Sequence, residues 1–184
     1  MSNKILAVVG MCGSGKSVAT EVFVKAGWHK VYFGAITFEE MARRNMPINE
    51  ANERKIREEF RASGDKAIYA KLNQAKIEEG LTKGNVLVES MYSWSEYKYL
   101  KEIYGDRFEV LCIVTNAGLR RERLLTRPIR PFSIEDSTSR DYAEIEFIEK
   151  GGPIGIADYY ITNNDNEEEF IKQVVAFEKE YSKK

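Results

Sequence analysis

The feature that most constrains this chain is a glycine-rich segment close to its start. Residues 10–17 read Gly-Met-Cys-Gly-Ser-Gly-Lys-Ser and match the pattern G-x-x-x-x-G-K-[ST]. An apolar run over residues 5–9 precedes the segment, and a helix-patterned stretch follows it. In this context the glycines let the backbone turn with its N–H groups inward, where they can surround phosphate oxygens. The pattern therefore predicts a phosphate-binding loop, here called the P-loop, between a first strand and a first helix.

The residue types in the P-loop indicate how a nucleoside triphosphate would be held. Lys16 can reach the outer phosphates, and the Ser17 hydroxyl can bind Mg²⁺. A glycine-rich turn without a ligand is the alternative, and the strand and helix around the motif argue against it. The predicted ATP site in this part of the chain comprises Gly10, Met11, Cys12, Gly13, Ser14, Gly15, Lys16 and Ser17.

Length and composition limit the classes of protein to consider. The 184 residues, 43% of them hydrophobic and 31% charged, suffice for one well-buried core and are short for two. We therefore expect a single domain over residues 1–184. The net charge of -1 offers no basic field, so neither nucleic acid nor a membrane is expected as the main partner. No cleavable or membrane-spanning apolar segment is recognisable, which favours a cytoplasmic location.

Strand-like and helix-like segments alternate along the chain. Apolar runs predict strands at 5–9, 31–33, 86–88, 108–114 and 159–161. Helical periodicity and capping residues predict helices at about 16–26, 36–45, 50–63, 66–80, 94–104, 116–127, 137–150 and 167–181. This alternation, with short connections, indicates an α/β protein with the three-layer α/β/α P-loop NTPase fold and a five-stranded parallel sheet. Ligands of such sheets bind at the carboxyl ends of the strands.

Two segments look like substrate-handling additions to that sheet. The helices between the second and third strands form an insert, about residues 36–80, which could bind an acceptor. Residues 128–136, with Pro128 and Pro131, read as a mobile loop, and Gly151-Gly152-Pro153 as the end of the following helix. Together with the arginines around it, this loop predicts a lid, about residues 126–140, that could close over a ligand.

Arginines without any lysine mark the region of the predicted lid. Arginine suits phosphate, because its planar fork meets two oxygens at once and its face can stack on a base. Arg123 and Arg127 are four residues apart and share a helix face. A solvated basic face is the alternative, and we prefer it for Arg121. The arginines between residues 115 and 140 are Arg120, Arg121, Arg123, Arg127, Arg130 and Arg140.

The rest of the sequence favours a kinase over other nucleotide-driven proteins. Glu89 ends the third apolar run, where P-loop proteins place an acid that serves the metal, although an ordinary surface carboxylate is the alternative. A guanine-reading N-K-x-D motif and the length of a motor are both lacking. We therefore predict ATP and Mg²⁺ as cofactors and a small-molecule acceptor. The predicted catalytic residues are Lys16, Glu89, Arg127 and Arg130, and the predicted metal ligands are Ser17 and Glu89.

Three residues are candidates for binding the acceptor, namely Arg57, Tyr92 and, from the predicted lid, Arg140. Arg57 lies on an insert helix, and Tyr92 follows Glu89 by three residues. Acidic residues alternate with the arginines of that helix, so an exposed, ion-paired helix is the alternative for Arg57.

Several motifs taken in order resemble dephospho-coenzyme A kinases and the related branch of the nucleoside monophosphate kinases. They are the P-loop, the arginine helix, the run Arg-Asp-Tyr-Ala-Glu at 140–144 and the run Ala-Asp-Tyr-Tyr-Ile-Thr-Asn-Asn at 157–164. The resemblance implies ATP, Mg²⁺ and a nucleotide-like acceptor, either dephospho-coenzyme A or a nucleoside monophosphate. It also implies that Arg123 stacks on adenine, that Asn163 lies near the base, that Arg127 and Arg130 contact phosphates, and that Arg140 reaches in from the lid.

The chain departs from that family pattern after the second strand. Relatives usually carry an Asp there, often with an Arg three residues later, whereas residues 32–38 read Tyr-Phe-Gly-Ala-Ile-Thr-Phe. Relatives typically end the third strand in Asp, where this chain has Glu89. Glu39 or Glu40 could replace the missing acid, although carboxylates in the first turns of a helix are expected from the helix dipole alone. A regulator that binds nucleotide without transferring phosphate is therefore a second hypothesis, and no oligomeric state is indicated.

Overall fold

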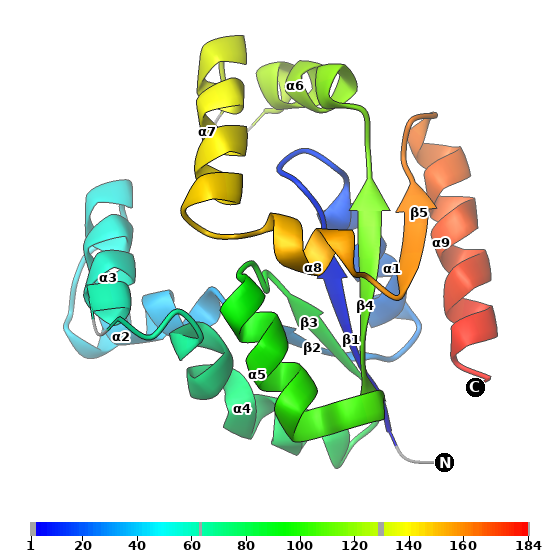
Figure 1. Ribbon diagram of the computed structural model, residues 1–184, viewed down its shortest axis with the longest axis horizontal. Helices are drawn as coiled ribbons and strands as arrows, with labels where there is room; N and C mark the ends of the chain where they lie inside the picture. Colours follow the sequence, from blue (N-terminus) through cyan, green and yellow to red (C-terminus); the bar gives the residue numbers. More distant parts are fainter. Residues whose placement is uncertain (1–2, 63, 129–130, 184) are drawn as a thin grey trace.

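Five parallel strands form the centre of the computed structural model, which describes residues 3–62, 64–128 and 131–183 (Figure 1). The sheet order is β2-β3-β1-β4-β5, with every neighbouring pair parallel. The strands are β1 (Ile5–Val9), β2 (His29–Tyr32), β3 (Val86–Glu89), β4 (Phe108–Val114) and β5 (Tyr159–Thr162). The predicted five-stranded parallel sheet is confirmed.

Helices cover both faces of the sheet. One face packs against α1 (Lys16–Lys25) and α9 (Glu167–Tyr181), and the other against α4 (Ile68–Leu81), α5 (Trp94–Tyr104) and α8 (Gly151–Gly155) (Figure 1). Because side chains alternate along a strand, β1 supplies both cores. Ile5, Ala7 and Val9 belong to the core under α4 and α5, and Leu6 and Val8 to the core under α1 and α9. The predicted three-layer α/β/α fold is therefore confirmed.

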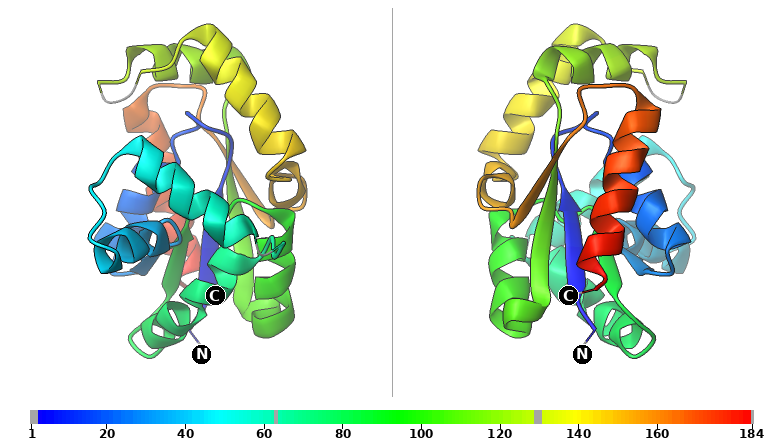
Figure 2. Two further views of the ribbon diagram at one scale, coloured as in Figure 1. Left: turned by 90° about the vertical axis from the view of Figure 1, so that its left-hand side faces the viewer. Right: turned by 90° about the vertical axis from the view of Figure 1, so that its right-hand side faces the viewer.

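The remaining helices extend beyond this sandwich. The predicted insert contains α2 (Ala35–Arg43) and α3 (Glu50–Ala62) together with α4. The helices α6 (Ala117–Thr126) and α7 (Ile134–Glu146) lie above the carboxyl ends of the strands (Figure 2). A 3-10 turn, η1 (Gly105–Arg107), leads into β4. In the part of the chain that the structure describes, no helix combines the length and apolar character needed to cross a membrane.

Two sequence predictions around the lid are wrong. Helix α7 begins at Ile134, inside the predicted loop 128–136, because the Ser133 hydroxyl caps it by accepting the amide of Asp136 at 3.0 Å. The helix also ends before residue 150, since Glu149 adopts a left-handed backbone with φ of 59°. Gly151-Gly152-Pro153 starts α8 instead of ending a helix, and proline is tolerated in a first helical turn.

Candidate active site

The P-loop connects β1 to α1 at the carboxyl edge of the sheet. Gly10 has a φ of 142° and Gly15 a φ of 97°, a region that residues with a Cβ rarely adopt. A Cβ on Gly10 would overlap the carbonyl of Ile113, and one on Gly15 the side-chain amide of Asn163. The loop therefore requires glycine at both positions. Its backbone leads directly into the N-terminus of α1, the positive end of that helix's dipole.

Side chains from neighbouring segments hold the P-loop in this shape. Asn163 Nδ2 and Thr115 Oγ1 both donate to the carbonyl of Ser14, at 2.9 and 3.0 Å. Arg120 donates to the carbonyl of Cys12 at 2.9 Å. Asn163 is buried, so the structure places this predicted ATP residue beneath the loop that it supports.

Arg120 ties the loop to both helices of the lid region. Its guanidinium donates to both carboxylate oxygens of Asp141 on α7, at 2.8 and 2.9 Å, and both residues are buried. Arg121, for which we predicted a solvated position, is partly buried and lies 3.8 Å from the same carboxylate. This Arg120–Asp141 pair was not predicted from the sequence. The sequence does place the arginine and the aspartate on two successive helices, but it does not show that they meet.

Lys16 of the P-loop lies within reach of the positive charges of Lys150 and Arg140. Its Nζ donates to the carbonyl of Met11 at 2.9 Å. Burial, and then the charge of Lys150, lower the pKa of Lys16 to about 7. The Ser14 hydroxyl is buried and has no hydrogen-bond partner among the described residues. A lysine with a lowered pKa and a buried hydroxyl without a partner among the described residues both fit a phosphate, which would accept hydrogen bonds from each of them.

We expect ATP binding to take up a proton above pH 7. In the free protein Lys16 is largely neutral above its pKa of about 7, and bound phosphates favour the charged ammonium. The groups that act on Lys16 are Lys150, Glu144, Cys12 and Arg140. ATP affinity should therefore fall as the pH rises from 7 to 9.

Calorimetry in buffers of different ionisation enthalpy measures the proton uptake. Lys16→Arg, which stays charged, is the control, and an equal pH dependence in both proteins would contradict the expectation.

Ser17 and Glu89, the predicted Mg²⁺ ligands, lie on neighbouring elements at the carboxyl edge of the sheet. Ser17 is exposed in the first turn of α1. Glu89 ends β3 in register with Val8 of β1, next to the strand that leads into the P-loop. The Glu89 carboxylate is partly buried and lies 3.3 Å from Lys30 Nζ. A hydroxyl and a carboxylate fit Mg²⁺, which prefers oxygen ligands and takes the rest from phosphates and water.

The predicted lid arginines occupy different positions. Arg123 donates to the carbonyls of Asn163 and Asp165, at 3.1 and 3.2 Å, which holds it against the loop after β5. Arg127 follows α6, and its guanidinium lies 4.4 Å from the ring centre of Phe132. Arg140 lies 5.5 Å from the same ring centre. Arg130 falls outside the described residues. The stacking of Arg123 on adenine and the phosphate contacts of Arg127 and Arg130 stay predictions.

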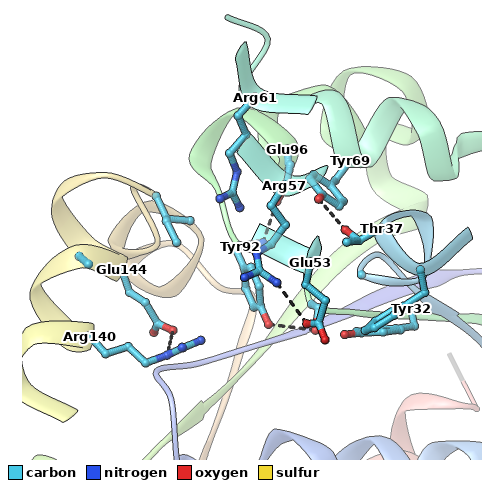
Figure 3. Close-up of a pocket in the computed structure, with 15 residues that line it drawn as sticks. Tyr32, Thr37, Glu53, Arg57, Arg61, Tyr69, Tyr92, Glu96, Arg140 and Glu144 are labelled. Atoms are coloured by element: carbon cyan, nitrogen blue, oxygen red, sulfur yellow. Dashed lines mark hydrogen bonds and ion pairs between the residues drawn. The ribbon is translucent and has the colours of Figure 1, made fainter. Parts of the chain in front are cut away.

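A cavity of about 410 Å³ lies between the insert and α7 (Figure 3). Figure 3 shows Arg57 and Arg61 of α3 on one side of it, Arg140 and Glu144 of α7 on the other, and Tyr92 between them. All three predicted acceptor residues, Arg57, Tyr92 and Arg140, therefore line one cavity. Its volume lies within the range of small-molecule sites.

The acids of this cavity are not those that the sequence suggested. Glu40 accepts hydrogen bonds from Arg43 and Arg44, Glu39 pairs with Lys76, and neither is among the described residues that line the cavity. Glu53 lines the cavity instead, four residues before Arg57, to which it is 3.3 Å away. A signal for Glu53 existed, because Ile56 and Phe60 mark the inward stripe of α3 and Glu53 lies on that stripe.

Comparison with known proteins finds relatives that cover almost the whole chain. It is 33% identical to a UPF0200 protein of Thermococcus onnurineus, over 92% of this chain and 94% of that one. It is 32% identical to a UPF0200 protein of Thermococcus gammatolerans, over 92% of this chain and 91% of that one. No family model matches the chain.

Solved structures share the fold at low sequence identity. A crystal structure from Thermus thermophilus matches with a TM-score of 0.69 at 14% identity, over 100% of this chain and 98% of that one. A shikimate kinase from Bacteroides thetaiotaomicron matches with a TM-score of 0.60 at 14% identity, over 98% of this chain and 99% of that one. A dephospho-CoA kinase from Campylobacter jejuni matches with a TM-score of 0.58 at 18% identity, over 99% of both chains. The chain therefore has the fold of P-loop kinases.

Proposed function

We propose that this chain, which belongs to the UPF0200 family, is an ATP- and Mg²⁺-dependent kinase that phosphorylates a small nucleotide-like acceptor. The acceptor would be dephospho-coenzyme A or a nucleoside monophosphate. In this proposal residues 1–184 act as one kinase domain, the insert binds the acceptor, and α6 and α7 form the lid.

One observation carries the proposal. The P-loop and the cavity are adjacent, because Arg140 and Glu144 on α7 lie near both of them. Their charges act on Lys16 of the P-loop, and both side chains line the cavity. A phosphoryl donor in the P-loop and an acceptor in the cavity would therefore meet beneath the lid, as direct transfer requires.

The residues present can supply what phosphoryl transfer needs from a protein. An acceptor oxygen forms a bond to the γ-phosphorus, and the bond from that phosphorus to the bridging oxygen breaks, which releases ADP. Lys16 and the P-loop amides would bind the β and γ phosphates, while Arg127 and Arg130 would offset charge from the lid. Mg²⁺, held by Ser17 and Glu89 directly or through water, would supply further charge neutralisation.

A nucleotide-binding regulator without transfer activity is the second candidate. The segment after β2 favours it, because Phe33 packs into the core and the Thr37 hydroxyl shares a hydrogen bond of 2.8 Å with Tyr69. Neither side chain can replace the missing family acid as a base. An acceptor that attacks through an ionised phosphate oxygen would not need that base, so this feature weighs more against dephospho-coenzyme A than against a monophosphate.

A coupled ADP-release assay separates the two candidates. The protein is mixed with ATP and Mg²⁺, and then with dephospho-coenzyme A or with each member of a panel of ribo- and deoxynucleoside monophosphates. A kinase releases ADP faster with one acceptor, and that release must be absent from the Lys16→Met variant. ATP binding without stimulation by any acceptor would favour the regulator.

Glu89→Gln should lower kcat by about 10²-fold or more and leave ATP binding in place. The amide keeps the size of the side chain but loses the charge that would orient Mg²⁺ and its water. Rates with the best acceptor and calorimetry with ATP check the two halves of this prediction. Glu39→Gln, at an ion-paired position outside the cavity, is the matched control. An unchanged kcat in Glu89→Gln would remove Glu89 from the mechanism.

A further inference from the structure

A buried lysine between α7 and α8 lies beside the P-loop without a role in the mechanism above. The Lys150 side chain is 2% exposed. Its Nζ donates to Glu144 Oε2 at 2.8 Å and lies 4.4 Å from the centre of the Tyr92 ring. Burial lowers the pKa of Lys150, since taking an ammonium out of water disfavours its charged form. A structure keeps such a group only where partners compensate for the lost water.

The local backbone fixes this lysine in place. Glu149 has a left-handed backbone, and the amide of Lys150 donates to the carbonyl of Glu144 at 3.0 Å. The Glu149 carboxylate pairs with Lys66 of the segment before α4, which ties the turn to the insert. The turn therefore directs the Lys150 side chain inward, toward the Glu144 carboxylate six residues earlier, in α7.

The charges around Lys150 do not balance. Glu144 carries one negative charge and accepts hydrogen bonds from Lys150 and, at 3.2 Å, from Arg140. Burial alone would raise the pKa of Glu144, but Lys150 lowers it, so the carboxylate is ionised at neutral pH. When Lys16 and Lys150 carry their protons, which a bound anion favours, they and Arg140 together offer three positive charges. The next acid, Asp141, is already paired with Arg120. This group is therefore completed by an anion of about two charges, such as a phosphoryl group.

The position of Lys150 indicates which phosphate it would meet. Its two side-chain neighbours, Tyr92 and Glu144, line the cavity (Figure 3), while its charge acts on Lys16 in the P-loop. Lys150 thus lies at the boundary between the two sites. The terminal phosphate of ATP is the one that would reach that boundary.

We propose that Lys150 is a second phosphate-binding lysine, which contacts the γ-phosphoryl group of ATP from the acceptor side and stays with it during transfer. The transfer role rests on the proposed function, whereas the contact with ATP does not require turnover. Lys150 forms no covalent bond and gives up no proton. It neutralises charge while the acceptor oxygen bonds to the γ-phosphorus and ADP leaves.

The test compares the affinities of ATP and ADP, both with Mg²⁺, by calorimetry. Lys150→Met should weaken ATP by about 10-fold or more and ADP by less than about threefold, because only ATP carries the contacted phosphate. Lys150→Arg keeps the charge and should retain part of the preference for ATP. Lys98→Met, at an exposed position on α5, is the matched control and should bind both nucleotides like the unaltered protein. If Lys150→Met does not fold, the double variant Lys150→Met/Glu144→Gln replaces it, since it leaves no unpaired buried charge.

The outcomes separate this inference from the proposed function. A lost preference for ATP supports the inference even if no acceptor stimulates turnover, in which case the kinase proposal fails alone. A preference that survives in Lys150→Met overturns the inference while acceptor-dependent turnover still supports the kinase. An equal loss of ATP and ADP binding, or no preference in the unaltered protein, also overturns it, because both indicate a lysine that merely supports the turn.

Discussion

Replacing Lys16 with methionine should abolish turnover and, at the same time, make the free protein more stable. The ammonium is the group that would hold the outer phosphates, so we expect kcat to fall by about 10³-fold or more. In the free protein the same ammonium lies near Lys150 and Arg140, and burial and these charges lower its pKa to about 7. Methionine of similar length removes that repulsion, which should raise the free energy of unfolding by ~1–3 kcal/mol.

The pH dependence of stability identifies the source of that gain. Between pH 7 and 10.5 the unfolded chain keeps a proton on Lys16 that the folded chain has lost. Stability of the unaltered protein should therefore rise with pH over this window, and Lys16→Met should lack that part of the rise. Urea unfolding at several pH values measures the difference. A methionine variant that is less stable than the unaltered protein at pH 7 would show that the lysine stabilises the empty loop.

Breaking the Arg120–Asp141 pair should cause a large loss of stability. Arg120→Met leaves the buried Asp141 carboxylate without its bidentate partner and the carbonyl of Cys12 without its donor. Removal of one member of a buried pair typically costs ~3–5 kcal/mol. Because the pair also joins α6, α7 and the P-loop, ATP affinity should fall in the same variant. Urea unfolding and calorimetry at a temperature where the variant is folded check the two effects.

A matched control comes from an exposed ion pair. Arg54 lies 2.7 Å from Glu58 one turn along α3, and both side chains are largely exposed. Arg54→Met should cost less than ~1 kcal/mol, as exposed pairs usually do. The double variant Arg120→Met/Asp141→Leu should recover part of the stability lost in Arg120→Met, since it removes both members of the buried pair. An equal cost for Arg54→Met and Arg120→Met would contradict a structural role for the buried pair.

Most of the fold could be predicted because its signals are local. Short apolar runs predicted the strands and period-3.6 patterns the helices, and α9 was predicted at the residues where the structure has it. The region after α6 was harder. Its helix start depends on a single serine cap at Ser133, and its end on a left-handed Glu149, which is not a residue type that signals such a turn.

In the candidate site, too, residues that follow one another in the sequence were predicted, and several of the residues that folding brings together were missed. The P-loop is contiguous, so one stretch of sequence predicts all of its residues. The cavity joins α2 and α3 to α7, and its three predicted residues were found because charged or aromatic side chains stood out near motifs. Lys150, Glu144 and the Arg120–Asp141 pair were missed because their meaning depends on partners brought together by folding. A buried lysine looks like an exposed one in a sequence until its neighbours are known.

Calorimetry of ATP and Mg²⁺ with the folded, unaltered protein tests the central claim most directly. The P-loop geometry predicts one ATP bound per chain, with a dissociation constant between about 1 μM and 1 mM. Circular dichroism and cooperative unfolding would establish that the sample is folded. Folded protein that binds neither ATP nor GTP at these concentrations would contradict the account, because the proposed chemistry begins with phosphates bound at residues 10–17.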